Sequence, residues 1–239
     1  AEVRGLAIKV LAVDGERVQP LTPDSHPEQH TQDFLMTNNP TQLASTAQDF
    51  MKFGDIQDSF LASLFLAKKL RSANVARRII FRNVDSLVNE QYWSDAPIRL
   101  GNTHSIKYTA RPCSKNSNPA RNGDDRLTED LRAFAATNPI CFDFQVQFQL
   151  DGDKQPMEDA LTEWDEDDTP FVTVARIHFP AQELKETNGC ERLRFTPWHA
   201  LAEHQPVGNM NRGRESVYAS SQRHRSAIQE EPDENTIDK

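Results

Sequence analysis

The chain has 239 residues, a length that can bury one large hydrophobic core. Its hydrophobic and charged fractions, 37% and 26%, are typical of a globular protein rather than a disordered or fibrous one. The formal net charge of −9 argues against a broad nucleic-acid-binding surface, and no apolar run approaches the ~20 residues of a membrane span.

The first segment predicts a β-strand. Residues 3–13 are rich in Val, Ile and Leu and end at the turn signal Asp14-Gly15. A polar loop with several prolines follows, and leads into the segment DFLMTNNP, residues 33–40. Because a strand lies so near the first residue, we expect that an N-terminal portion is missing from this chain.

Apolar residues then recur at helical spacing in three segments. Residues 41–53 predict the first helix, with Thr41 as its N-cap and Gly54 as its C-cap. Residues 56–70 predict a second helix, and residues 75–87 a third. We interpret these apolar stripes as helix packing.

The clearest predicted strand is ICFDFQVQFQL, residues 140–150, in which apolar and polar residues alternate throughout. Further strands are predicted at residues 104–110, 172–179 and 191–195, with a short helix at 127–136. The order of strand, helices, several strands and a final helix predicts an α+β domain built on an antiparallel β-barrel.

The three cysteines, Cys113, Cys141 and Cys190, are far apart and form no CxxC pair. The sequence therefore predicts neither a zinc knuckle nor a disulfide framework, but a reducing compartment. The first residues also lack the pattern of a signal peptide, which favours a cytoplasmic location. The acidic stretch at residues 158–168 lacks the ligand spacing of a calcium loop and predicts a solvated acidic loop.

The last periodic stretch predicts a helix that carries Arg214 and Tyr218 on one face, one turn apart. Arg225 lies two turns beyond Tyr218 on roughly the same side. Taken alone, an Arg–Tyr pair at this spacing is more often an ordinary surface contact than a site. Residues 229–239 are polar, charged and without periodicity, and predict a disordered tail.

Five segments, in the same order, resemble the haem catalase family, and especially its compact bacterial-type catalase-related proteins, which include allene oxide synthase-like members. The segments are VRGLAIKVLAVDG, DFLMTNNP, TEWDEDDTPFVTVARIHF, ERLRFTPWHALAEHQPVGNMNRGRE and RESVYASSQRHRS. Together they extend over nearly the whole chain, so the resemblance rests on more than one motif.

The resemblance implies an antiparallel catalase-like barrel over residues 1–210 that is incomplete at its N-terminus. The barrel would carry a helical insertion around 41–88 and a wrapping segment at 190–210, and a proximal haem helix would follow at 211–228. Haem b is the implied cofactor, and hydrogen peroxide or an organic hydroperoxide the implied substrate. The resemblance is compatible with a homo-oligomer.

The resemblance also implies roles for individual residues. Tyr218 would be the axial ligand of the haem iron, as tyrosine is in catalase. Arg214 would favour the ionised phenolate of that ligand, and Arg225 would pair with a haem propionate. On the opposite side of the haem, Asn38 would orient the peroxide and Phe50 would stack near the ring.

One departure from the family pattern concerns the distal histidine, which in the family precedes the strand that corresponds to residues 3–13. None of the seven histidines of this chain has that position. Because a general base must lie within hydrogen-bond reach of its proton, this chain alone is expected to be inactive. The segment TQLASTAQDF after Pro40 also lacks the family's aromatic pair and Arg-Asp.

Three functions stay open from the sequence. The first is a Tyr-ligated haem enzyme that dismutates hydrogen peroxide or uses it as a peroxidase. The second is a lyase or isomerase of organic hydroperoxides, similar to catalase-related allene oxide synthases. The third is a haem-free or truncated barrel with a binding or structural role.

Overall fold

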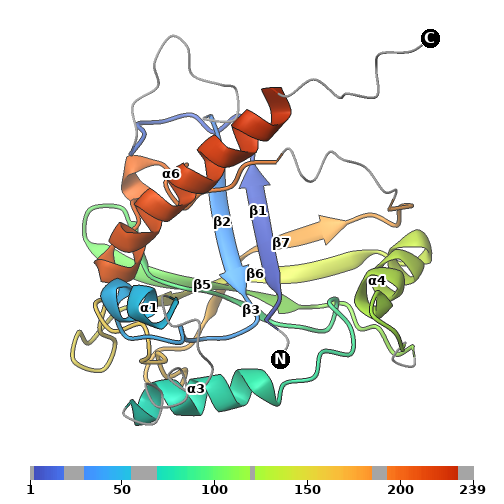
Figure 1. The fold of residues 1–239 in the computed structure, drawn as a ribbon. Coiled ribbons are helices and arrows are strands. Elements are labelled where there is room, and N and C mark those ends of the chain that lie inside the picture. Colours follow the sequence, from blue (N-terminus) through green and yellow to red (C-terminus); the bar gives the residue numbers. More distant parts are fainter. Residues whose placement is uncertain (1–2, 19–29, 55–68, 119–121, 185–192, 231–239) are drawn as a thin grey trace.

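The computed structural model describes residues 3–18, 30–54, 69–118, 122–184 and 193–230, and Figure 1 shows their arrangement. A curved antiparallel sheet forms the centre, and helices pack around it. The elements, in chain order, are β1 (Gly5–Val10), β2 (Gln32–Thr37), α1 (Ala47–Gly54), α3 (Leu70–Ile80), β3 (Tyr92–Ser94), β4 (Ile98–Leu100), β5 (His104–Pro112), α4 (Arg126–Thr137), β6 (Ile140–Phe148), β7 (Val172–Phe179), the 3-10 helix η2 (Ala202–His204) and α6 (Gly208–Glu230).

The seven strands form one sheet in the order β1-β2-β3-β5-β6-β7, with β4 paired to β5. Every pairing is antiparallel, and the longest run in register, Ile106↔Phe148 to Pro112↔Phe142, joins β5 to β6. The sheet curls into a half-barrel, and β1 and β7 are its two edges among the described residues. The predicted α+β class, built on an incomplete antiparallel barrel, is therefore confirmed.

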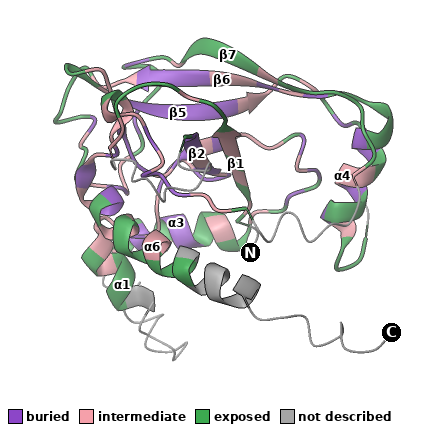
Figure 2. Cartoon of the chain, turned by 90° about the horizontal axis from the view of Figure 1, so that it is seen from above, coloured by how far each residue is buried: buried purple, intermediate pink, exposed green. Residues whose placement is uncertain are grey.

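The core lies on the inner face of the curl, where β6 presents Ile140, Phe142 and Val146. The Phe144 ring packs against Phe34 and Tyr108 at centroid distances of 5.0 and 5.6 Å. The period-two pattern of β6 thus identified the inner face correctly. In Figure 2, β5 and β6 are mostly buried, whereas β7 is mostly exposed.

The outer face of β6 departs from its sequence pattern, because two of its glutamines are also buried. Gln147 is 1% exposed, and its side-chain amide donates to the backbone carbonyls of Trp164 and Thr169 at 3.0 and 2.7 Å. The acidic stretch predicted as a solvated loop therefore covers this face: its carboxylates are largely exposed, but Trp164 is 3% exposed.

Two segments near the N-terminus differ from their predictions. The segment from Asp33 to Thr37, for which no strand was predicted, is part of strand β2, because it pairs with β1 on one side and with β3 on the other. The first helix begins at Ala47, not near Thr41, because the backbone at Gln42 and Ser45 bonds to Ala160 instead.

The third predicted helix begins and ends earlier than expected. Helix α3 covers Leu70–Ile80, so the residues from 81 to 87 are not helical. Asn83 and Asp85 bond to each other at 2.7 Å, a local side-chain contact that competes with helix formation. The predicted second helix, apart from its end, lies outside the described residues.

Towards the C-terminus, the predicted strand at residues 191–195 is wrong for its described part, because Leu193–Phe195 form no strand. The strands predicted at 104–110 and 172–179 and the helix at 127–136 are confirmed as β5, β7 and α4. Most of the predicted tail, residues 231–239, lies outside the described residues.

The prediction of no disulfide is also wrong. Cys113 and Cys141 form a disulfide with their Cα atoms 5.3 Å apart, across the end of β5 and the start of β6. The antiparallel ladder of β5 and β6 brings these two positions together, and spacing along the chain gave no sign of it. Because disulfides persist mainly in oxidising environments, the cysteine pattern no longer favours a reducing compartment. Cys190 lies outside the described residues.

Helix α6 lies across one side of the molecule, with α1 against its N-terminal part (Figure 1). Gly213 permits this close approach, because a Cβ atom at that position would overlap the side chain of Ala47. None of the helices in the described ranges combines the length and apolar character that a bilayer crossing requires.

Candidate functional site

Helix α6 brings Arg214 and Tyr218 into contact, as their spacing predicts. The Arg214 guanidinium donates to the Tyr218 hydroxyl at 3.3 Å, and its carbon lies 5.3 Å from the centre of the Tyr218 ring. The Tyr218 side chain is half-buried, and that of Arg214 is 14% exposed. The phenol therefore has a permanently charged donor beside its oxygen.

The first turn of α6 is fixed by contacts with other elements. The Asn209 side chain accepts a hydrogen bond from the backbone of Ala47 at 2.7 Å, at the first residue of α1. The Asn211 side chain donates to the Pro97 carbonyl at 2.8 Å and accepts from Arg214 at 3.2 Å. Gly208, with φ at 87°, allows the chain to turn into the helix against Met157. These contacts set the position from which Arg214 projects.

Asp95, just after β3, is a further charged member of the site. Its carboxylate lies 3.5 Å from the Arg214 guanidinium and accepts a hydrogen bond from Thr37 at 3.0 Å. Burial raises the pKa of the Asp95 carboxyl, and Arg214 and Thr37 oppose that rise. Burial lowers the pKa of the Arg214 guanidinium, but the negative charge of Asp95 and the contact with Tyr218 outweigh burial, so this pKa lies above its ordinary value. Asp95, Arg214 and Tyr218 thus form one electrostatic unit.

A cavity of about 310 Å³ lies beside this unit. Both Arg214 and Tyr218 line it, together with Asp95 and Phe50, so three of the five residues predicted for the site border one cavity. Its remaining lining residues are Gln42, Ala47, Met51, Met210, Gly213 and Val217.

The apolar wall of the cavity is unusually exposed. Phe50, Met51 and Val217 are 42%, 55% and 53% exposed, and all three border the same space. Apolar patches of this kind commonly mark ligand or partner sites. These three side chains place an exposed apolar surface next to the Tyr218 hydroxyl.

The other two predicted residues lie elsewhere or cannot be described. Asn38 is 1% exposed; its amide donates to Glu90 and accepts from the Arg4 backbone, both at 2.8 Å, and it does not line the cavity. Arg225 falls within α6, two turns beyond Tyr218, but its side chain lies outside the described residues.

Sequence reasoning missed Asp95 and Met210 as members of the site. No local pattern marks Asp95, because the fold alone brings the end of β3 beside α6. Met210 lies one helical turn before Arg214, on the same face of α6, and could have been included by this spacing.

The side chains present fit a Tyr-ligated haem better than a metal ion held by several protein ligands. Among the described residues, no group of three or more His, Cys, Asp and Glu side chains is placed to hold a metal ion. Tyr218 offers a single oxygen donor, Arg214 donates a hydrogen bond to that oxygen, and Phe50 and Val217 offer apolar contact for a ring.

Known proteins match this chain in structure but not in sequence. No family model matches the chain, and no curated protein matches it. Among solved structures, a bacterial catalase matches 94% of this chain at a TM-score of 0.72 and 16% identity. A fungal catalase and catalase A from Saccharomyces cerevisiae each match 82% of it, at TM-scores of 0.66 and 0.65 and 15% identity.

At this identity the likeness establishes the fold alone, and the fold is catalase-like. The chain covers 46%, 45% and 46% of the three solved chains, which is less than half of their length. The resemblance seen in the sequence is therefore supported at the level of fold.

Proposed function

We propose that this chain binds haem through Tyr218 and takes part in peroxide metabolism. The observation that carries the proposal is the contact of Arg214 with the Tyr218 hydroxyl beside an exposed apolar cavity. A barrel with no ligand has no evident need for this buried cation–phenol pair. The catalase-like fold supports the same reading.

Each residue of the unit has a separate task in this proposal. Tyr218 provides the ligand oxygen, and Arg214 places its hydrogen bond and positive charge beside that oxygen. Asp95 holds the guanidinium in place from the end of β3. When bound, haem would supply the iron at which the peroxide O–O bond is cleaved.

The apolar residues would hold the ring and exclude water. Phe50, Met51 and Val217 would cover one part of the ligand and become buried on binding. Arg225 remains the residue proposed to pair with a propionate. Asn38 remains the residue proposed to orient peroxide, although its amide bonds to Glu90 in this state.

The decisive experiment is a haemin titration of the purified chain followed by ultraviolet–visible spectroscopy. We expect a saturable Soret band of ferric haem in the wild type and its loss or shift in Tyr218→Phe. Tyr92→Phe is the matched control, because it removes a phenol whose hydroxyl bonds to the Leu87 carbonyl away from the cavity. An identical spectrum in Tyr218→Phe and wild type would refute the ligand assignment.

The substrate is tested next on the haem-loaded chain, with hydrogen peroxide and a fatty-acid hydroperoxide compared side by side. Dismutation or peroxidase turnover of hydrogen peroxide supports the catalase-like activity. Rearrangement of the fatty-acid hydroperoxide without oxygen release supports a lyase or isomerase. The absence of specific haemin uptake would overturn the proposal in favour of a haem-free barrel.

A further inference from the structure

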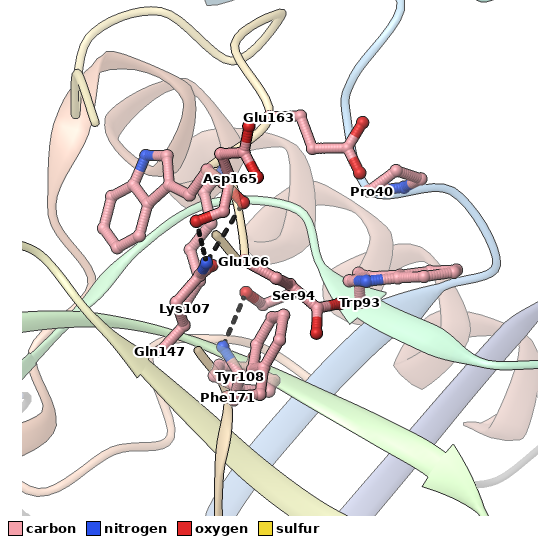
Figure 3. Close-up of a pocket in the computed structure, with 11 residues that line it drawn as sticks. Pro40, Trp93, Ser94, Lys107, Tyr108, Gln147, Glu163, Asp165, Glu166 and Phe171 are labelled. Carbon is pink, nitrogen blue, oxygen red and sulfur yellow. Dashed lines mark hydrogen bonds between the residues drawn. The ribbon is translucent and has the colours of Figure 1, made fainter. Parts of the chain in front are cut away.

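A second cavity, of about 400 Å³, lies on the outer face of the sheet beneath the loop that contains Trp164. Figure 3 shows Lys107 of β5 among the residues that line this cavity, together with Trp93, Phe171, Glu163 and Glu166. Its volume is within the range of small-molecule sites. The proposed haem function uses none of these residues.

Lys107 is the unusual member of this cavity. It is 6% exposed, and its ammonium makes one long hydrogen bond, to the Thr162 carbonyl at 3.4 Å. It also lies 5.1 Å from the centre of the Trp164 ring. An ammonium carries three donors, so this buried group has donor capacity that no described acceptor uses.

The nearby carboxylates do not pair with Lys107. Glu166 is bound by Arg111 at 2.9 Å, and Glu163 lies 3.6 Å from Arg78. The edge of the cavity is therefore partly neutralised by two arginines. The lysine beneath it is not ion-paired to these acids, which leaves its nitrogen available to a bound molecule.

Burial makes the Lys107 amine easier to deprotonate than that of an exposed lysine. Burial lowers the pKa of Lys107 to about 8, while the more distant charges of Glu163, Asp95 and Asp159 oppose that change. A large fraction of the amine is thus unprotonated at mildly alkaline pH. An unprotonated, buried lysine at the wall of a cavity has the properties required of a nucleophilic amine.

Two other lysines show what is distinctive here. Lys9 is also largely buried, but it bonds to both carboxylate oxygens of Asp33 at 2.8 and 3.0 Å. Lys154 is exposed and bonds to Asp168 at 2.5 Å, and this contact raises its pKa. Both amines have a carboxylate partner within 3 Å, whereas Lys107 has none among the described residues.

We propose that this cavity binds small aromatic carbonyl compounds and that Lys107 captures them as an imine. The Lys107 nitrogen adds to the carbonyl carbon, and the carbonyl oxygen then leaves as water with the two protons of the amine. The step needs no oxidant or reductant. The rings of Trp93 and Phe171 provide the flat, apolar contacts that select an aromatic aldehyde over an aliphatic one.

The test uses benzaldehyde as the probe and borohydride to reduce the imine to a stable secondary amine, on the chain without added haemin. Intact mass and peptide mapping then identify the modified lysine. We expect one benzyl group, located on Lys107, with labelling that rises as the pH passes about 8. Label spread over exposed lysines such as Lys154, with none on Lys107, would overturn the proposal.

Three variants distinguish the contribution of the Lys107 amine to labelling from that of the aromatic cavity wall. Lys107→Met should abolish the single addition, while Lys154→Met, in which an exposed lysine is lost, should retain it. Trp93→Ala keeps the amine and should weaken labelling of Lys107 roughly fivefold through the lost ring contact. Propanal should label Lys107 less than benzaldehyde does, and equal labelling by the two aldehydes would refute an aromatic site.

Discussion

The Arg214 guanidinium of helix α6 lies 3.5 Å from the Asp95 carboxylate, which follows strand β3. The pair joins the helix that carries Tyr218 to the curved sheet, and both side chains are largely buried. The Arg214–Asp95 contact therefore affects both the position of helix α6 and the balance of charge beside Tyr218. The first prediction concerns that contact.

Asp95→Asn should destabilise the fold by roughly 1–3 kcal/mol, because it leaves the buried charge of Arg214 without its counter-ion. Chemical denaturation at neutral pH measures the change in the free energy of unfolding. Asp143→Asn is the control, since it removes a carboxylate paired with the exposed Arg176 and should cost less than about 1 kcal/mol. Equal costs for the two variants would contradict a structural role of the Arg214–Asp95 pair.

Gly213→Ala should separate α6 from α1. A methyl group at this position overlaps Ala47, so we expect a loss of about 1–3 kcal/mol despite the better helix propensity of alanine. Thermal unfolding and haemin titration should both report the change. Gly152→Ala is the matched control, because a Cβ atom there meets nothing within 4 Å. An unchanged or raised melting temperature in Gly213→Ala would argue against the close packing.

Phe50→Ala should weaken haemin binding without altering the identity of the iron ligand. The ring is 42% exposed beside the cavity, and its loss removes apolar contact while Tyr218 remains. We expect the dissociation constant to rise by roughly tenfold and the Soret position to stay the same. Phe81→Ala, which removes an 80% exposed ring outside the cavity, should leave the affinity unchanged. A shifted Soret band in Phe50→Ala would instead indicate a change of ligand.

The burial of Lys107 predicts a distinct pH dependence of stability. The pKa of its amine falls from 10.5 to about 8 on folding. Below pH 8 both states carry the charge, so its burial cost is fully present. Between pH 8 and 10.5 the unfolded chain binds more protons than the folded one, and the cost is relieved as the pH rises.

Lys107→Met should therefore be more stable than the wild type near pH 7, by on the order of 3 kcal/mol at most. This advantage should shrink as the pH is raised from 8 to 10.5, which denaturant titrations across that range would measure. Lys154→Met removes a fully exposed lysine and should leave the stability nearly unchanged. A constant difference for Lys107→Met at every pH would contradict a buried, weakly protonated amine.

The disulfide should contribute measurably to stability. Cys113 and Cys141 are separated by 28 residues along the chain, for which loop closure predicts about 3.6 kcal/mol. Paired Cys113→Ser and Cys141→Ser substitutions should lower the unfolding free energy by that order. Thiol titration of the denatured wild type should gain two thiols after reduction. No gain would show that the two cysteines are unpaired.

The sequence predicted those parts of the fold in which neighbours along the chain determine the outcome. The strict alternation from Ile140 to Phe148 identified β6 and its inner face, and the four-residue spacing of Arg214 and Tyr218 placed both side chains together. In each case the regular geometry of one element fixes the relation between its residues. Local periodicity was sufficient there.

The parts that could not be predicted depend on contacts between distant segments. Asp95 reaches Arg214 only because the sheet brings β3 beside α6. Lys107 and Gln147 look like solvent-facing residues of two strands, but the loop around Trp164 covers them. The pairing of Asp33–Thr37 into β2 likewise follows from the strands on either side. The residues next to these positions in the sequence do not indicate these long-range contacts.

The link between Cys113 and Cys141 closes a covalent ring that contains helix α4. A protease that cuts the backbone once inside this ring would create a new pair of termini but would not release a fragment. The nicked protein would migrate as one species on a denaturing gel without reductant and as two after a thiol is added. A preparation judged intact only under non-reducing conditions can therefore contain cleaved chains.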